Sequence, residues 1–298
     1  MGEAPGRAGG RGRRGRRRQG RVGGGQQGPL LAHRREQDER GRRRARRHAR
    51  QRRCQHDRQR RGQGPGSGRA VDIAFAREGA DVVISYLDED GDARDTAEWI
   101  EKAGRRVLLI PGDITSEAHC RAIVDKTVEA FGRVDVLVNN AAFQRTYGAI
   151  NEISTEEWEK TFQTNIHAPF YLARAAVAHM KSGSAIINTT SIQSRQPSSH
   201  LLAYASTKGA ISNFTAGLAE MLAEQGIRVN AVAPGPIWTP LIPSTMPAQK
   251  TQSFGKQTLL GRAGQPAELA GAYVLLASDL GSFMTGAVIP VTGGEIMI

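Results

Sequence analysis

From residue 70 onward, short apolar runs alternate with longer amphipathic stretches, and this alternation constrains the fold more than any other feature. The apolar runs lie at 82–84, 107–110, 134–138, 185–187, 229–232 and 287–291. The stretches with helical periodicity lie near 70–79, 92–103, 116–131, 154–181, 204–225 and 266–278. Strands that alternate with helices of this length predict βαβ units. We therefore expect an α/β fold: a doubly wound parallel sheet of the Rossmann type with helices on both faces.

Polar residues follow the predicted strands. In such a sheet, ligands bind beyond the carboxyl ends of the strands. The residues after the first five runs are Tyr86 and Leu87, Asp113 and Ile114, Asn139 to Ala142, Thr190 and Ser191, and Pro234 and Gly235. Each pair alone also fits an ordinary turn, since strand ends commonly carry turn formers. Five such ends at one edge of a sheet indicate a binding site.

The N-terminal segment has a different composition from the rest of the chain. Through Arg69 there are 23 arginines, no lysine and five acidic residues, whereas the remainder holds 18 basic and 24 acidic residues. The basic net charge therefore belongs to the N-terminus. A segment with so few apolar side chains cannot offset its ordering entropy. We expect residues 1–61 to be a disordered Arg/Gly-rich tail and residues 62–298 to form the Rossmann-type domain.

Three interpretations of this tail stay open. It is an out-of-frame or mis-started translation of a GC-rich gene, an inert solvated tail, or an arm that binds nucleic acid through its phosphates. The first is favoured because Arg, Gly, Ala and Pro have GC-rich codons and the boundary is abrupt. Aromatic residues are absent through Arg69, so no base could stack there.

Several classes of protein are disfavoured by composition. Only Cys54 and Cys120 are present, so a disulfide framework is not expected. No apolar run reaches the roughly 18 residues of a membrane helix, and the N-terminus lacks the apolar h-region of a secretory signal. We expect a cytoplasmic protein with no membrane contact and no metal site.

Tyr204 and Lys208 are one helical turn apart, so both side chains lie on one face of a predicted helix. A nearby ammonium favours the phenolate and makes a tyrosine a usable acid or base. Such a pair alone is weak evidence, because surface pairs with this spacing arise by chance. Its weight comes from Ser191, which stands 13 residues earlier at the end of a predicted strand.

Ser191, Tyr204 and Lys208 resemble the catalytic triad of the short-chain dehydrogenase/reductase family in type and spacing, and Asn165 resembles its fourth catalytic residue. The likeness extends from about Gly62 to the C-terminus and is greatest to bacterial general-stress and aldehyde-reductase members. It implies that Tyr204 exchanges a proton with the substrate oxygen and that Lys208 lowers the tyrosine pKa and holds the ribose. It further implies that Ser191 polarises the carbonyl and that Asn165 holds a water.

The same resemblance implies residues that bind the nicotinamide cofactor. Besides Tyr204 and Lys208 they are Gly62, Gly66, Gly68, Tyr86, Asp113, Ile114, Asn140, Ala141, Pro234, Gly235, Ile237 and Thr239. Asn139 to Ala142 is similar to the family's NNAG segment, with Ala142 in place of glycine. The helices near 154–181 and 204–225 resemble those that pair between subunits, which implies a homotetramer.

Tyr86 occupies the position that determines whether a dinucleotide-binding fold prefers NAD or NADP. An acidic residue at the end of the second strand binds the ribose 2′-OH of NAD, whereas arginine suits the 2′-phosphate of NADP. Tyr86 is neither. Without a carboxylate to repel the phosphate, NADP is favoured, with NAD or the use of both as the alternative.

The first strand departs from the family. The glycines of the TGxxxGIG loop survive at Gly62, Gly66 and Gly68, but Arg61 and Ser67 replace Thr and Ile. The preceding residues 52–61 contain no aliphatic side chain, although this strand should be buried on both faces. Burying unpaired guanidinium groups there is prohibitive.

These observations leave three functions. The leading one is an NAD(P)-dependent oxidoreductase that moves a hydride between nicotinamide and a small carbonyl or alcohol. The alternative is an inactive or cofactor-deficient relative that has lost its first strand. The third, nucleic-acid binding through the tail, rests on charge alone.

Overall fold

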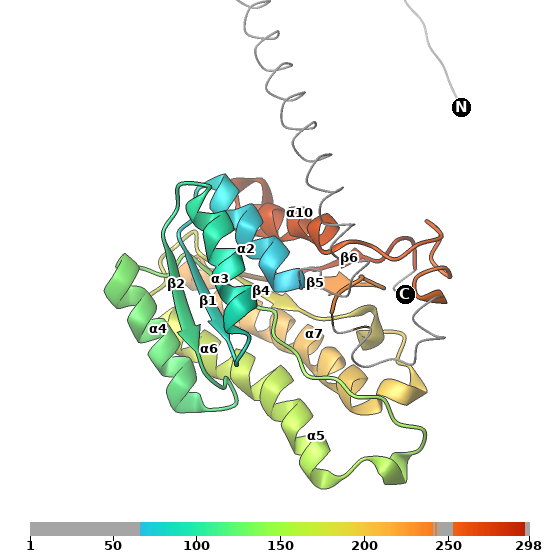
Figure 1. The fold of residues 1–298 in the computed structure, drawn as a ribbon. Helices are drawn as coiled ribbons and strands as arrows, with labels where there is room; N and C mark the ends of the chain where they lie inside the picture. Colours follow the sequence, from blue (N-terminus) through green and yellow to red (C-terminus); the bar gives the residue numbers. More distant parts are fainter. Residues whose placement is uncertain (1–65, 241, 243–252, 296–298) are drawn as a thin grey trace, which may run out of the picture. The chain divides into compact units, whose positions relative to one another are not determined.

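The computed structural model describes residues 66–240, 242 and 253–295, which belong to one compact unit (Figure 1). The expected tail, residues 1–61, and Gly62 lie outside the described residues. The main helices are α2 (Ser67–Glu78), α3 (Asp90–Glu101), α4 (Glu117–Phe131), α5 (Thr155–Phe162), α6 (Ala168–Val177), α7 (Leu202–Leu222) and α10 (Pro266–Ala277). The strands are β1 (Val82–Tyr86), β2 (Val107–Pro111), β3 (Val136–Asn139), β4 (Ala185–Thr189), β5 (Arg228–Pro234) and β6 (Val288–Val291).

The strands of the described residues form two parallel sheets. β1 pairs with β2, from Val82 opposite Val107 to Tyr86 opposite Pro111. The other sheet has the order β3-β4-β5-β6, and all of its pairs are parallel. The sequence predicts a single doubly wound sheet; among the described residues, the sheet is divided between β1 and β3.

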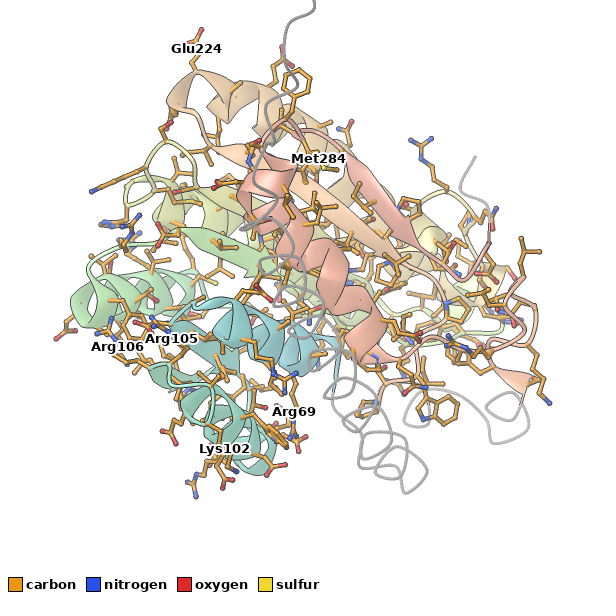
Figure 2. The ribbon with its side chains drawn as sticks, turned by 90° about the horizontal axis from the view of Figure 1, so that it is seen from above. Arg69, Lys102, Arg105, Arg106, Glu224 and Met284 are labelled. Carbon is orange, nitrogen blue, oxygen red and sulfur yellow. The ribbon has the colours of Figure 1, made fainter. Side chains whose placement is uncertain are left out.

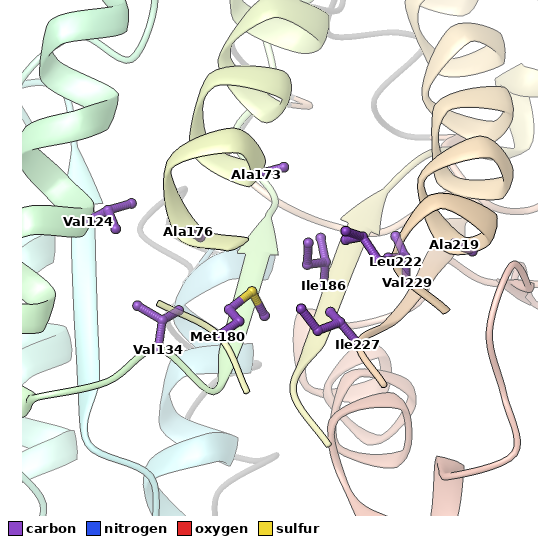
Figure 3. Packing of buried hydrophobic residues seen from close by; sticks show 10 residues of the cluster. All are labelled: Val124, Val134, Ala173, Ala176, Met180, Ile186, Ala219, Leu222, Ile227 and Val229. Carbon is purple, nitrogen blue, oxygen red and sulfur yellow. The ribbon is translucent and has the colours of Figure 1, made fainter. Parts of the chain in front are cut away.

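Helices cover both faces of the larger sheet, because neighbouring residues of its strands point to opposite sides. Ile186 on β4 belongs to a cluster with Val124 of α4, Ala173 of α6 and Leu222 of α7 (Figure 3). The next residue packs with the other helices: Ile187 belongs to a cluster with Val71 of α2 and with Leu269 and Tyr273 of α10. This is the layered architecture predicted from the alternating strands and helices.

The central strands of the larger sheet are far more buried than the strands beside the division. Every residue of β4 except Thr189 is buried, and β5 is buried from Val229 to Ala233. In β1 only Val82 is buried, and in β3 only Asn139. A strand that is central in a parallel sheet is normally buried along its whole length. β1 and β3 therefore have the burial of edge strands.

Helix α2 connects the two sheets on one face. Val71 near its start packs on the cluster of β4, β5 and α10, whereas Ala76 near its end packs with Val82 of β1 and Ile100 of α3. Apolar packing through α2 thus spans the place where the sheet itself is divided.

Charged side chains gather around the smaller sheet. Asp81, directly before β1, pairs with Arg105 at 2.7 Å and with Arg106 at 2.6 Å, and Arg69 of α2 pairs with Asp95 of α3 at 2.9 Å. Figure 2 shows Arg105 and Arg106 close together and well away from Glu224 and Met284.

Most elements lie where the sequence predicts them, with one interruption. The helical stretch expected near 154–181 is divided into α5 and α6 by a π-helical turn, Gln163–His167. None of the helices in the described part of the chain is both long and apolar enough to span a membrane.

Candidate active site

Ser191 and Lys208 meet at the carboxyl end of β4. Ser191 follows the strand, is 7% exposed, and its Oγ accepts a hydrogen bond from the Gln193 backbone N–H at 3.2 Å. Lys208 lies on α7 and is 2% exposed. Its Nζ donates to the Thr189 carbonyl at 2.7 Å, so the ammonium is fixed at the strand end that the sequence analysis singled out.

Tyr204 lies one turn before Lys208 on the same face of α7, as its spacing predicts. The Lys208 Nζ lies 5.3 Å from the centroid of the Tyr204 ring. Ser191 hydrogen-bonds the tyrosine side chain, which favours its charged form. The three predicted triad members are therefore brought together.

The acid–base state of the pair differs from the sequence-based expectation. Burial raises the pKa of Tyr204 to about 12, and the hydrogen bond from Ser191 lowers it only in part. Burial also lowers the pKa of Lys208, to about 8. Desolvation disfavours the charged form of both groups, so it outweighs the lowering of the tyrosine pKa that an adjacent ammonium was expected to give.

Asn165 lies in the π-helical turn and is 1% exposed. Its Oδ1 accepts from the Phe143 N–H at 2.7 Å, while its Nδ2 donates to the Phe143 carbonyl at 2.9 Å and to Thr207 Oγ1 at 3.0 Å. The side chain thus ties the segment after β3 to α7, beside Lys208. Its expected water-holding role stays a prediction.

A buried polar chain supports the site, and sequence reasoning missed most of it. Asn139 Nδ2 donates to Asn188 Oδ1 at 2.9 Å, and Asn188 Nδ2 donates to Thr215 Oγ1 at 2.9 Å. Tyr273 and Thr189 share a hydrogen bond of 2.7 Å between their hydroxyls. Asn188 is a polar residue after an apolar run in the sequence, and this was the feature from which its role could have been predicted.

The two described glycines of the predicted nucleotide loop lie at the start of α2. Gly66 is the N-cap residue and no acidic side chain stands in the first turn, so this helix end is suited to an anion. A Cβ on Gly68 would lie 3.1 Å from Asn140 Nδ2. Asn140 and Ala141 follow β3, so the glycine allows this segment and α2 to approach closely.

The predicted adenosine-binding residues follow β1 and β2. Tyr86 ends β1, and its hydroxyl donates to Asp90 Oδ1 at 2.7 Å. This bond and partial burial raise the tyrosine pKa. Asp113 Oδ1 accepts from the Thr115 N–H at 2.9 Å, and the Ile114 carbonyl accepts from Cys120 Sγ at 3.1 Å.

The predicted nicotinamide segment follows β5. Pro234 ends that strand, and a Cβ on Gly235 would lie 2.7 Å from Thr292 Cα, so only glycine fits there. Ile237 is buried and bridges to Gly264, and the Thr239 carbonyl accepts from the Ile242 N–H at 3.1 Å. Residues 243–252, which continue this segment, lie outside the described residues.

The residues present fit a dinucleotide better than a metal ion. An open helix N-terminus, the close approach at Gly68 and the clustered hydroxyl and ammonium groups suit a phosphate and a ribose. No group of three or more His, Cys, Asp or Glu side chains that could hold a metal occurs in the described part of the chain.

Comparison with known proteins extends this result. Residues 64–295 match the family model described as enoyl-(acyl carrier protein) reductase. The chain is 56% identical over 232 residues to the uncharacterized oxidoreductase YhdF of Bacillus subtilis, covering 78% of this chain and 80% of that protein. It is 46% identical over 239 residues to NADPH-dependent aldehyde reductase 1, chloroplastic, of Arabidopsis thaliana, covering 78% and 83%.

Solved structures share the fold. A short-chain dehydrogenase/reductase from Serratia marcescens aligns with a TM-score of 0.72 at 30% identity, over 77% of this chain and 93% of that one. A blue fluorescent protein from a metagenomic library, in complex with NADPH, aligns with a TM-score of 0.71 at 32% identity over the same shares.

Proposed function

We propose, on the premise that this chain belongs to the short-chain dehydrogenase/reductase family of NAD(P)-dependent oxidoreductases, that it reduces a small carbonyl compound with NADPH and catalyses the reverse oxidation. The observation that carries the proposal is the cluster of Ser191, Tyr204 and Lys208 at the carboxyl end of β4. Two relatives support the choice of NADP: one is named NADPH-dependent, and one is solved with NADPH.

The bound cofactor supplies the hydride. Ser191, whose Oγ is fixed by the Gln193 N–H, orients the substrate oxygen. Tyr204 donates the proton to that oxygen in reduction and accepts it in oxidation. Lys208, held at the Thr189 carbonyl, is placed to bind the ribose and to favour the phenolate. Asn165 keeps the segment after β3 against α7.

The first experiment replaces the proton donor. Tyr204→Phe removes only the hydroxyl, so turnover of a small aldehyde should fall by at least about 100-fold while NADPH affinity stays within about twofold. Tyr171→Phe, on α6 and away from the site, is the matched control and should keep full turnover. Near-normal turnover of the Tyr204 variant would refute the assignment.

A second candidate, a cofactor-deficient relative, is favoured by one specific observation. Residues 52–61, where the family has its first strand, hold no aliphatic side chain. Titration with NADPH and NADH, followed by nicotinamide fluorescence, separates the two candidates. The cytoplasmic location, the homotetramer and the division into residues 1–61 and 62–298 stay predictions, as does nucleic-acid binding by the tail.

A further inference from the structure

Tyr273 on α10 is a fully buried phenol that no step of the proposed reaction uses. It packs in the apolar cluster that includes Val71 of α2 and Ile187 of β4. A hydroxyl in such a place is costly unless it is hydrogen-bonded, and phenylalanine would fill the space without that cost. We propose that Tyr273 is a positioning residue of the cofactor site: its hydroxyl orients Thr189 and, through Thr189, the Asn140 carboxamide. This inference rests on the proposed binding of NADPH.

Thr189, the last residue of β4, connects Tyr273 to the active site. Residues of a strand alternate between its two faces, so the Thr189 side chain lies on the same face as Ile187, where α10 packs. Its Oγ1 and the Tyr273 hydroxyl are 2.7 Å apart. Its carbonyl accepts from Lys208 Nζ at 2.7 Å. Thr189 therefore contacts α10 through its hydroxyl and α7 through its main chain.

The direction of these hydrogen bonds follows from the protons that each group carries. The Thr189 hydroxyl has one proton, which it donates to Asn140 Oδ1 at 3.4 Å. Burial raises the pKa of Tyr273, so the phenol stays protonated at neutral pH and is able to donate. The Tyr273 hydroxyl therefore donates to Thr189 Oγ1, and the Thr189 hydroxyl donates onward to Asn140.

This hydrogen-bond chain determines which end of the Asn140 carboxamide faces the start of α2. A carboxamide has an acceptor oxygen and a donor nitrogen of similar shape, so its partners decide its orientation. With Oδ1 at Thr189, Nδ2 lies 3.1 Å from the place that a Cβ on Gly68 would take. The first turn of α2 is suited to the cofactor's pyrophosphate. An N–H donor beside it favours an anion, whereas a carbonyl oxygen would repel one.

Loss of the Tyr273 hydroxyl should therefore weaken cofactor binding and spare the chemical step. Without that hydroxyl, Thr189 Oγ1 lacks a donor, which is costly for a buried oxygen. A reversed Asn140 carboxamide supplies the donor from Nδ2 and turns its oxygen toward α2. Lys208 keeps its partner, because it is held by the Thr189 main chain rather than by the hydroxyl. The structure thus predicts a change in NADPH affinity with little change in kcat.

The test titrates the full chain with NADPH, followed by nicotinamide fluorescence, and measures turnover of a small aldehyde. Tyr273→Phe should raise the Kd of NADPH at least about fivefold, as expected for the loss of a hydrogen bond to a charged group. Its kcat at saturating NADPH should stay within about twofold. Tyr171→Phe on α6 is the matched control and should keep the Kd. An unchanged Kd in Tyr273→Phe, or a large fall in kcat alone, would overturn the proposal.

Variants of Thr189 distinguish positioning from general packing. Thr189→Val keeps the shape of the side chain without its hydroxyl and should raise the Kd of NADPH as much as Tyr273→Phe does. Thr189→Ser keeps the hydroxyl and should bind NADPH with near-normal affinity. Because both residues act through one hydrogen-bond chain, the double variant Tyr273→Phe/Thr189→Val should bind no more weakly than either single variant. Additive losses of affinity would overturn the proposal.

Chemical denaturation without cofactor gives a readout that does not depend on NADPH. The effects of Tyr273→Phe and Thr189→Val on the free energy of unfolding should also be non-additive, because each leaves the other hydroxyl unpaired in a buried place. Additive effects would overturn the link between the two residues. A chain that binds no NADPH would overturn the proposed function together with this inference. NADPH binding that all these variants preserve would overturn the inference alone, so the two failures are distinguishable.

Discussion

The smaller sheet, β1 and β2, and the larger sheet, β3 to β6, are stabilised in different ways. The larger sheet is buried between two helix layers and contains the Asn139–Asn188–Thr215 hydrogen-bond chain. The smaller sheet has one small apolar cluster and the ion pairs of Asp81 with Arg105 and Arg106. Exposed ion pairs contribute little, whereas buried apolar area contributes most of the stability of a domain.

This difference separates the two halves of the proposed active site. Ser191, Tyr204 and Lys208 lie on the larger sheet and its helix α7, so the catalytic groups have a rigid support. Tyr86 and Asp113, expected to contact the adenosine, follow the strands of the smaller sheet. The chain can therefore preserve its catalytic geometry while its nucleotide half is weakly held.

The largest difference in stability between the two sheets should appear when one isoleucine of each sheet is replaced by alanine. Ile187 on β4 is fully buried, whereas Ile84 on β1 is only partly buried. Ile187→Ala should lower the free energy of unfolding by about 3–4 kcal/mol, and Ile84→Ala by roughly 1 kcal/mol, because less area and a smaller cavity are involved. Chemical denaturation with an unchanged m-value measures both. Equal losses would remove the distinction between the sheets.

The buried Lys208 should make the free energy of unfolding depend on pH, and this effect should be of intermediate size. Burial lowers the Lys208 pKa from 10.5 to about 8. Between these values the unfolded chain binds a proton that the folded chain does not, so this group makes the free energy of unfolding rise with pH. The rise between pH 8 and 10 should be about 1–2 kcal/mol. Lys208→Met should abolish it; the same rise in both proteins would show that Lys208 is charged when folded.

The ion pairs of the smaller sheet should have the smallest and most local effect. Hydrogen bonds from Arg106 hold the pKa of Asp81 below its usual range, so their stabilisation is present above pH 3.8 and is lost as pH falls through the folded pKa. Asp81→Asn should speed trypsin cleavage after Arg105 and Arg106 by about 2- to 5-fold, with little change in the melting temperature.

Asp135→Asn is the control, because it breaks the ion pair of Asp135 with Arg133 at the start of the larger sheet. It should leave cleavage after Arg105 and Arg106 unchanged. A large fall in the melting temperature of Asp81→Asn would contradict a merely local role.

Much of the fold was predictable because the periodicity of apolar residues along the sequence indicates which side chains are buried. The apolar runs at 82–84 and 185–187 became β1 and β4, and the spacing of Tyr204 and Lys208 placed both on α7. Residues 52–61 broke the pattern, but they lie outside the described residues, so the loss of the first strand stays a prediction.

Other features depended on contacts between distant segments. Asn188 and Thr215 lie 27 residues apart, so their hydrogen bond could not be read from spacing. The pKa of Tyr204 was expected to fall because Lys208 is near, but burial of the phenol raises it. Sequence spacing shows which charges are neighbours and does not show how much water remains around them.

Native-state hydrogen exchange tests most directly the claim that one half of the molecule is firmly held and the other weakly. Amides of β4 and β5 should exchange only through global unfolding, whereas those of β1 and β2 should have protection factors at least about 100-fold lower, through local opening of the smaller sheet. Equal protection of the two sheets would contradict the account, because it would mean that they unfold as one cooperative unit.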